Sequence, residues 1–252
     1  MMKLEDFAVQ TLNDRFPERI LVTGGSRGIG AACVRAFAAR GCRVTFLYAR
    51  SDEAAAALAA ETGALAVKAD VADRDAVFAA VERITAVMGA VDCLVNNAGI
   101  AQFRLFTDIT ADEWNRMLDV NLGGVFHCTQ AVLPGMIREK YGRIINLSSI
   151  WGLTGASCEV HYSAAKAGII GLTRALAKEL GPSGITVNCV APGVIETEMN
   201  AALDADTRAA LCDETPLECI GRPEDIAQAV LYFAAAPFVT GQVLSPNGGI
   251  VI

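Results

Sequence analysis

Short runs of β-branched and aliphatic residues alternate along this chain with longer stretches in which apolar residues recur at helical spacing. Short apolar runs bounded by Gly, Pro, Asn or Asp are typical of buried strands. The pattern predicts strands at 19–23, 43–48, 65–69, 92–96, 143–147, 185–190 and 242–245. It predicts helices at 29–40, 54–60, 73 to about 88, 110–138, 162–180 and 223–235.

The regular alternation of strand and helix predicts an α/β fold, in which a seven-stranded parallel sheet carries helices on both faces. Right-handed crossovers then give a doubly wound architecture. The chain has no internal repeat, low-complexity linker or shift in composition, so we expect residues 1–252 to form a single domain. Residues 1–17 match no element and are interpreted as an N-terminal arm or a disordered extension. Pro134 is expected to kink or shorten the helical segment 110–138.

Composition and charge narrow the function classes. The 252 residues are 53% hydrophobic and carry 21 basic and 28 acidic side chains, a formal net charge of −7. Such an acidic chain is a poor candidate for binding nucleic acid or an anionic membrane surface. We expect a cytoplasmic protein, because no signal peptide or membrane-spanning run is visible. The eight cysteines lack Cys-x-x-Cys spacing and the two histidines lack ligand spacing, so no metal site is expected.

A glycine-rich turn follows the first predicted strand and opens the first predicted helix. Its sequence is Thr23-Gly24-Gly25-Ser26-Arg27-Gly28-Ile29-Gly30. In a dinucleotide-binding turn, the first glycine permits the tight turn, the second lets the backbone approach the pyrophosphate, and the third allows close packing. The free N–H groups of the helix N-terminus then face the phosphates. The alternative is a glycine-rich turn without a ligand.

The end of the second strand indicates which dinucleotide this turn would bind. A site specific for NAD usually has Asp or Glu there, bonded to the ribose 2′-hydroxyl. Here the strand ends Tyr48-Ala49-Arg50-Ser51, without a carboxylate. Arg27, Arg50 and Ser51 suit a 2′-phosphate, which favours NADPH over NAD. Either arginine alone could instead be a solvated surface charge.

Tyr162 and Lys166 are four residues apart in a predicted helix, so both side chains lie on one face. Free tyrosine titrates near pH 10, and a neighbouring ammonium favours the phenolate and lowers that pKa. Ser149 precedes the tyrosine by thirteen residues and could hold a substrate oxygen. The spacing alone also fits a surface lysine beside a half-buried tyrosine.

Four further segments decide between these readings. They are Asn96-Asn97-Ala98-Gly99, Asn121, Ser149 with Tyr162-x-x-x-Lys166, and Pro192-Gly193. Together with the glycine-rich turn, they resemble the short-chain dehydrogenase/reductase family from about Arg19 to Gly249, which implies a Rossmann-like fold. The runs 162–171 (YSAAKAGIIG) and 184–196 (GITVNCVAPGVIE) and the ending Asn247-Gly248-Gly249 are most similar to bacterial 3-oxoacyl-[acyl-carrier-protein] reductases.

The resemblance implies a role for each of four catalytic residues. Tyr162 would give its proton to the carbonyl oxygen, and Ser149 would hold and polarise that oxygen. Lys166 would lower the pKa of Tyr162 and bond the nicotinamide ribose. Asn121 would hold a water that connects Lys166 to solvent, although it could also be an asparagine that satisfies the backbone in a helix kink.

The resemblance also implies contacts with the cofactor and the substrate. Asp70 and Val71 would contact adenine, Asn97, Ala98 and Gly99 would pass beneath the adenosine ribose, and Pro192, Gly193, Ile195 and Thr197 would seat the nicotinamide. The implied substrate pocket consists of Ile150, Trp151, Leu153, Val160 and Met199. Residues 194–216 would form an acidic, mobile substrate lid.

We therefore predict NADPH-dependent reduction of a ketone to a secondary alcohol, with a 3-oxoacyl thioester of the fatty acid biosynthesis type as substrate. The alternatives are an NAD(P)-dependent dehydrogenase of a sugar, steroid or small alcohol, and a non-catalytic nucleotide-sensing protein. Acyl-carrier protein is a possible partner. A basic cluster at Arg138, Lys140 and Arg143 could dock it, or could be a solvated helix end. The apolar C-terminus and the resemblance predict a homotetramer with two-fold interfaces.

Overall fold

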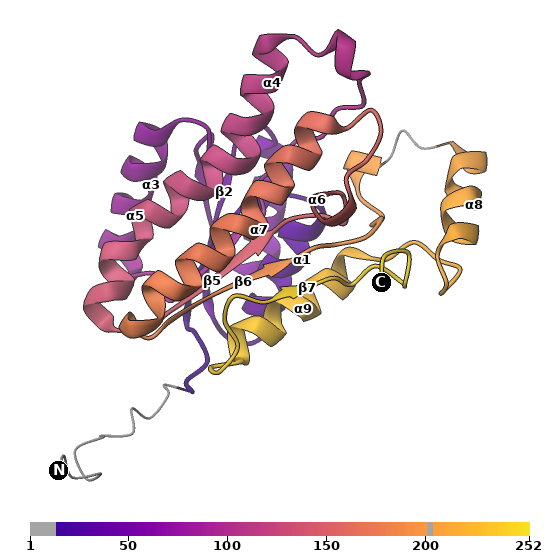
Figure 1. Ribbon diagram of the computed structural model, residues 1–252. Coiled ribbons are helices and arrows are strands. Elements are labelled where there is room, and N and C mark those ends of the chain that lie inside the picture. The colour runs from indigo at the N-terminus through magenta and orange to yellow at the C-terminus, as the bar shows by residue number, and fades with distance from the viewer. Residues whose placement is uncertain (1–13, 201–203) are drawn as a thin grey trace, which may run out of the picture.

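The chain folds around one parallel sheet. The computed structural model describes residues 14–200 and 204–252, apart from the side chain of Met199 (Figure 1). The strands are β1 (Arg19–Thr23), β2 (Arg43–Tyr48), β3 (Leu65–Lys68), β4 (Cys93–Asn96), β5 (Gly142–Leu147), β6 (Ile185–Val190) and β7 (Val243–Leu244). They pair in the order β3-β2-β1-β4-β5-β6-β7, and every pairing is parallel. The predicted doubly wound, seven-stranded α/β architecture is confirmed, and no predicted strand end is displaced by more than one residue.

Helices cover both faces of the sheet (Figure 1). One face packs against α1 (Gly28–Ala38), α2 (Asp52–Thr62) and α9 (Pro223–Ala235). The opposite face packs against α3 (Arg74–Met88), α5 (Gly124–Glu139) and α7 (Val160–Leu180). The remaining helical segments are η2 (Phe106–Asp108), α4 (Ala111–Leu118), η3 (Asp119–Gly123), α6 (Trp151–Thr154), η4 (Gly181–Ser183), η5 (Glu198–Asn200) and α8 (Ala205–Glu214).

The two faces bury separate apolar layers. Phe37, Phe46 and Phe233 are fully buried in one layer, and Leu94 and Ile144 are fully buried in the other. A strand enclosed on both faces needs apolar side chains in both directions, which explains why the central strands read as continuous apolar runs.

The region 110–138, predicted to form one or two long helices, is divided, although not at its proline. A π-helical turn, η3, separates α4 from α5. Helix α5 continues through Pro134 to Glu139, so the expectation that Pro134 shortens the helix is wrong. Pro134 is exposed on the surface of α5, where water can bond to a carbonyl that lacks its helical hydrogen bond.

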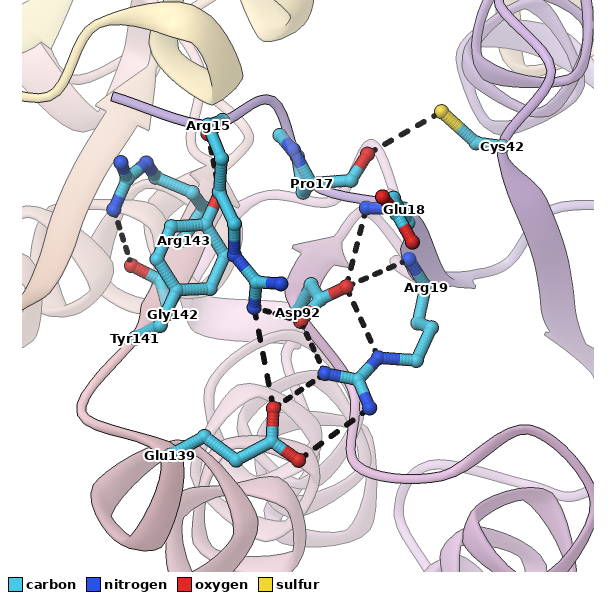
Figure 2. Close-up of polar contacts among 10 residues, drawn as sticks. All are labelled: Arg15, Pro17, Glu18, Arg19, Cys42, Asp92, Glu139, Tyr141, Gly142 and Arg143. Carbon is cyan, nitrogen blue, oxygen red and sulfur yellow. Dashed lines mark hydrogen bonds and ion pairs between the residues drawn. The ribbon is translucent and has the colours of Figure 1, made fainter. Parts of the chain in front are cut away.

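A buried carboxylate joins the N-terminal segment to the amino edge of the sheet (Figure 2). Asp92 is 1% exposed and accepts hydrogen bonds from the backbone N–H groups of Glu18 and Arg19. The Arg19 guanidinium donates to both Asp92 oxygens, at 3.0 and 2.6 Å, and also pairs with Glu139. These bonds hold the pKa of Asp92 below its usual range against the opposing effect of burial.

Residues 14–17 of the predicted N-terminal arm lie along this edge, and residues 1–13 lie outside the described residues. The Arg15 guanidinium donates to Asp92 at 3.0 Å and stacks 4.1 Å from the centroid of the Tyr141 ring. Arg143 also stacks on this ring and is only 2% exposed. Arg143 is therefore not available to the basic cluster that could dock acyl-carrier protein, because its side chain is buried against Tyr141.

No helix in the described ranges is long and apolar enough to cross a membrane. All eight cysteines are free. Cys33, Cys93, Cys128 and Cys189 are buried, as the apolar runs around them predict, whereas Cys219 is exposed.

Candidate active site

The carboxyl ends of the strands open into a cavity of about 540 Å³, within the range of roughly 300–1,000 Å³ that is usual for small-molecule sites. In doubly wound sheets, ligands bind at this edge because the connecting loops meet there. The side chains of Asn121, Ser149, Tyr162 and Lys166 all line the cavity. The structure thus brings the four predicted catalytic residues together from α7, from η3 and from the loop after β5.

The predicted cofactor-binding residues line the same cavity, with one exception. Those that line it are Gly24, Ser26, Arg27, Gly28, Ile29, Arg50, Ser51, Asp70, Val71, Asn97, Ala98, Gly99, Pro192, Gly193, Ile195 and Thr197. Gly30 does not reach the cavity. A Cβ atom at Gly30 would lie 2.2 Å from the carbonyl oxygen of Gly24, so this glycine permits close packing of α1 against the turn.

Two features fix the conformation of the glycine-rich turn, namely its glycine backbone and hydrogen bonds from the loop after β4. Gly24 and Gly28 have φ values of +62° and +53°, which L side chains rarely adopt. The Asn97 side-chain amide donates to the carbonyl oxygens of Thr23 and Gly24 at 2.9 and 3.0 Å. Helix α1 begins at Gly28 without a side-chain cap, which leaves its N-terminal N–H groups free for an anionic ligand.

Charges around the turn fit a phosphorylated ligand. Arg27 and Arg50 line the cavity, and neither has an ion pair within the described part of the chain. Asp70, which also lines the cavity, is neutralised by Arg116 at 2.7 Å. Asp52, at the start of α2, pairs with Lys68 at 2.7 Å. Among the described residues, this end of the cavity therefore has two cations without an ion pair, and the Glu198 carboxylate lies close to Gly28 of the turn.

Tyr162 and Ser149 supply two hydroxyl groups at the opposite end of the cavity. Both residues are buried, and Ser149 Oγ accepts a hydrogen bond from the Trp151 N–H at 3.2 Å. Burial raises the pKa of Tyr162 to about 12, although a hydrogen bond from Ser149 opposes this rise. The tyrosine is therefore protonated at neutral pH.

Lys166 lies beside Tyr162, as their spacing in the sequence predicts. The ammonium is 5.5 Å from the centroid of the Tyr162 ring and donates to the Leu147 carbonyl oxygen at 2.9 Å. Burial lowers the pKa of Lys166 itself to about 8. Burial is the largest influence on the pKa of both groups, and the lowering of the Tyr162 pKa by Lys166 stays a prediction.

Asn121 is fully buried in the π-helical turn. Its side-chain N–H groups donate to the carbonyl oxygens of Met117 and Ile100, both at 3.0 Å. Its Oδ1 atom accepts from the Ile100 N–H at 3.3 Å. These contacts match the backbone-satisfying alternative for Asn121, and its role in holding a water stays a prediction.

The substrate end of the cavity differs in part from expectation. Ile150 and Trp151 line it. Leu153 and Val160 do not line it, and are 42% and 37% exposed. The side chain of Met199 lies outside the described residues.

Comparison with known proteins agrees with this geometry. Residues 18–208 match the family model described as short chain dehydrogenase. The chain belongs to the short-chain dehydrogenase family. This short-chain dehydrogenase is thus an oxidoreductase that acts on C=O or CH–OH groups with a nicotinamide cofactor.

Several curated relatives are similar over almost their whole length. An acetoacetyl-CoA reductase of Shinella zoogloeoides is 44% identical, with 91% of this chain and 96% of the relative covered. A 3-oxoacyl-[acyl-carrier-protein] reductase of a Synechocystis strain is 43% identical, with 92% and 96% covered. Nodulation protein G of Azospirillum brasilense is 43% identical, with 91% and 96% covered.

In this short-chain dehydrogenase, the predicted lid 194–216 contains η5 and α8. Figure 1 shows α8 set apart from the helices that pack on the sheet. Thr207 and Leu211 of α8 line the cavity. The Glu196 carboxylate forms an ion pair with the Arg208 guanidinium at 3.0 Å. The mobility of this segment stays a prediction.

Sequence reasoning missed several residues that line the cavity, namely Ile100, Phe103, Arg116, Glu159 and Leu211. The sequence does not indicate Arg116 as a site residue, because its contact with Asp70 joins α4 to the distant loop after β3. Glu159 could have been found, since it precedes Tyr162 by three residues at the start of the same helix.

Proposed function

We propose that this short-chain dehydrogenase uses NADPH to reduce the ketone of a 3-oxoacyl thioester to a secondary alcohol. The observation that carries the proposal is the shared cavity, with the Ser149 and Tyr162 hydroxyls at one end and, at the other, Arg27 and Arg50, which have no ion pair among the described residues. Two relatives support the substrate class, because their names specify acetoacetyl-CoA and 3-oxoacyl-[acyl-carrier-protein] as substrates. Both molecules are 3-oxoacyl thioesters.

The charges at the glycine-rich turn favour the phosphorylated cofactor. Arg27 and Arg50 could pair with a 2′-phosphate, and Asp52 is already engaged by Lys68. An arginine guanidinium suits phosphate because its N–H groups can donate two parallel hydrogen bonds. When bound, NADPH supplies the hydride that reduces the carbonyl carbon.

Side chains at the substrate end of the cavity would supply the proton and stabilise the negative charge on the ketone oxygen. Ser149 would donate a hydrogen bond to the ketone oxygen, and Tyr162 would transfer its proton to that oxygen. A pKa of about 12 keeps Tyr162 protonated, which is the state that a proton donor requires. Lys166, with a pKa of about 8, is mostly charged at neutral pH and would stabilise the phenolate that remains.

The carrier of the acyl group and the assembly belong to the same proposal. Coenzyme A and acyl-carrier protein both present the acyl chain on a thioester, and Arg138 and Lys140 are exposed for an acidic carrier. We further propose a homotetramer, supported by exposed apolar side chains near the C-terminus at Tyr232, Phe238 and Ile252.

The test is NADPH oxidation against a panel of 3-oxoacyl thioesters on both carriers, sugars, steroids and small ketones, repeated with NADH. We expect the highest kcat/KM with a 3-oxoacyl thioester and NADPH. Higher kcat/KM with a sugar or small alcohol in the oxidative direction, or with NADH, would overturn the substrate or cofactor assignment. Absence of turnover with every compound would favour the nucleotide-sensing alternative.

A further inference from the structure

Glu159 places a carboxylate in the substrate end of the cavity. It immediately precedes α7 and lies one helical turn before Tyr162, so the two side chains are neighbours on one face. Both line the cavity. The negative charge of Glu159 also opposes ionisation of Tyr162 and adds to the rise in the tyrosine pKa that burial causes.

The Glu159 carboxylate has no partner in the described part of the chain. Its backbone carbonyl accepts from the Ser163 N–H at 2.8 Å, but its side chain does not cap the helix. No described side chain forms a hydrogen bond or ion pair with it, and burial alone raises its pKa. The other acidic residue that lines the cavity, Asp70, is paired with Arg116 at 2.7 Å.

The surroundings of Glu159 strengthen the interaction of its negative charge with a ligand in the cavity. Ile100, Phe103, Ile150 and Trp151 also line the cavity, and none of them forms a hydrogen bond with the Glu159 carboxylate. Poor solvation and the absence of a counter-ion both strengthen its interaction with a charged ligand. A partly buried carboxylate in such a setting prefers a hydrogen-bond donor and repels an anion.

We infer that Glu159 determines substrate specificity, by rejecting ketones that carry a carboxylate beside the carbonyl and accepting neutral ketone esters and thioesters. The inference rests on the proposed function, since it assumes that the ketone oxygen lies between Ser149 and Tyr162. Glu159 is then offset from that oxygen by one helical turn and faces the substituent on the ketone. A 3-oxo acid would place its carboxylate there, whereas an ester or thioester is neutral at the same position.

The discriminating substrates are acetoacetate and ethyl acetoacetate, which share the ketone and differ in charge. At pH 8, Glu159→Gln is expected to raise kcat/KM for acetoacetate about tenfold, the effect of about 1.4 kcal/mol of repulsion. The value for ethyl acetoacetate should change less than about threefold. Glu159→Asp keeps the charge and should keep the discrimination.

Glu82→Gln is the matched control, because it removes one negative charge at an exposed position of α3. It should leave both substrates unchanged. An unchanged ratio of the two kcat/KM values in Glu159→Gln would overturn the inference, as would an equal change in Glu82→Gln.

A binding measurement separates this inference from the proposed function. Calorimetric titration of each compound into the NADP⁺-loaded protein does not depend on turnover. If no ketone is reduced but Glu159→Gln still binds acetoacetate about tenfold more tightly, the proposed reaction fails and the charge selection stands. If ketones are reduced and the variant's relative affinities equal those of the wild type, the selection by Glu159 fails.

Discussion

Replacing Lys166 with methionine should stabilise the cofactor-free protein at neutral pH while removing a group that the proposed reaction uses. Lys166 is 4% exposed, and burial lowers its pKa from 10.5 to about 8. At about 1.4 kcal/mol for each pKa unit, the buried ammonium costs the folded state about 3 kcal/mol. Methionine has a similar length and no charge, so the variant avoids this cost.

The sign of the pH dependence follows from proton binding. Below about pH 8 the folded and unfolded states both hold the lysine proton, and the full cost is present. Between about pH 8 and 10.5 only the unfolded state holds it, so the free energy of unfolding of the wild type rises with pH. In the methionine variant this rise is absent.

Denaturant unfolding at pH 7 and pH 10 measures the effect. The lost hydrogen bond to the Leu147 carbonyl, worth about 1–2 kcal/mol, offsets part of the gain, so Lys166→Met should be about 1–2 kcal/mol more stable at pH 7. Its advantage should fall by about 2 kcal/mol at pH 10. Lys178→Met is the control, because Lys178 is exposed on the same helix and should show no such change. An equal difference between Lys166→Met and wild type at both pH values would refute the reasoning.

Three further predictions address the cofactor end and the base of the sheet. Gly30→Ala should weaken NADPH binding in a fluorescence titration by at least about tenfold, because its Cβ would meet a backbone oxygen of the turn at 2.2 Å, whereas Gly171→Ala has open space and should bind normally. Arg50→Ala should raise KM for NADPH about tenfold without raising KM for NADH, and exposed Arg83→Ala should change neither. Asp92→Asn should lower the free energy of unfolding by about 2–3 kcal/mol at pH 7, because it leaves two arginines without their buried partner. Since the pKa of Asp92 is depressed in the fold, the loss should shrink as denaturation is measured at lower pH and the wild-type carboxylate is protonated.

The sheet could be predicted from sequence because its strands are buried on both faces. The runs of β1 and β6 are rich in β-branched and aliphatic residues and are followed within two residues by glycine or proline, which leaves little choice of boundary. The helices around Asn121 and Pro134 could not be predicted as well. The π-helical turn depends on contacts of Asn121 with Ile100, twenty-one residues away, and the tolerance of Pro134 depends on its exposed position.

The candidate site could be predicted where one short motif supplies the residues, and less well where several elements meet. The glycine-rich turn lies between one strand and the helix that follows it, and Tyr162 and Lys166 lie in a single helix. The substrate end is harder to predict, because α6 and the loop before α7, in which Cys158 has φ +62°, set where Leu153 and Val160 lie. The pKa values of Tyr162 and Lys166 depend on depth of burial, which spacing along a helix does not reveal.

The most direct test of the proposed chemistry compares wild type with Tyr162→Phe in NADPH-dependent reduction of a 3-oxoacyl thioester. The substitution removes only the hydroxyl that donates the proton. We expect turnover to fall by about 10²–10⁴-fold, with NADPH affinity and the free energy of unfolding close to those of wild type. Turnover within a few-fold of wild type, with the fold and NADPH binding intact, would contradict the account.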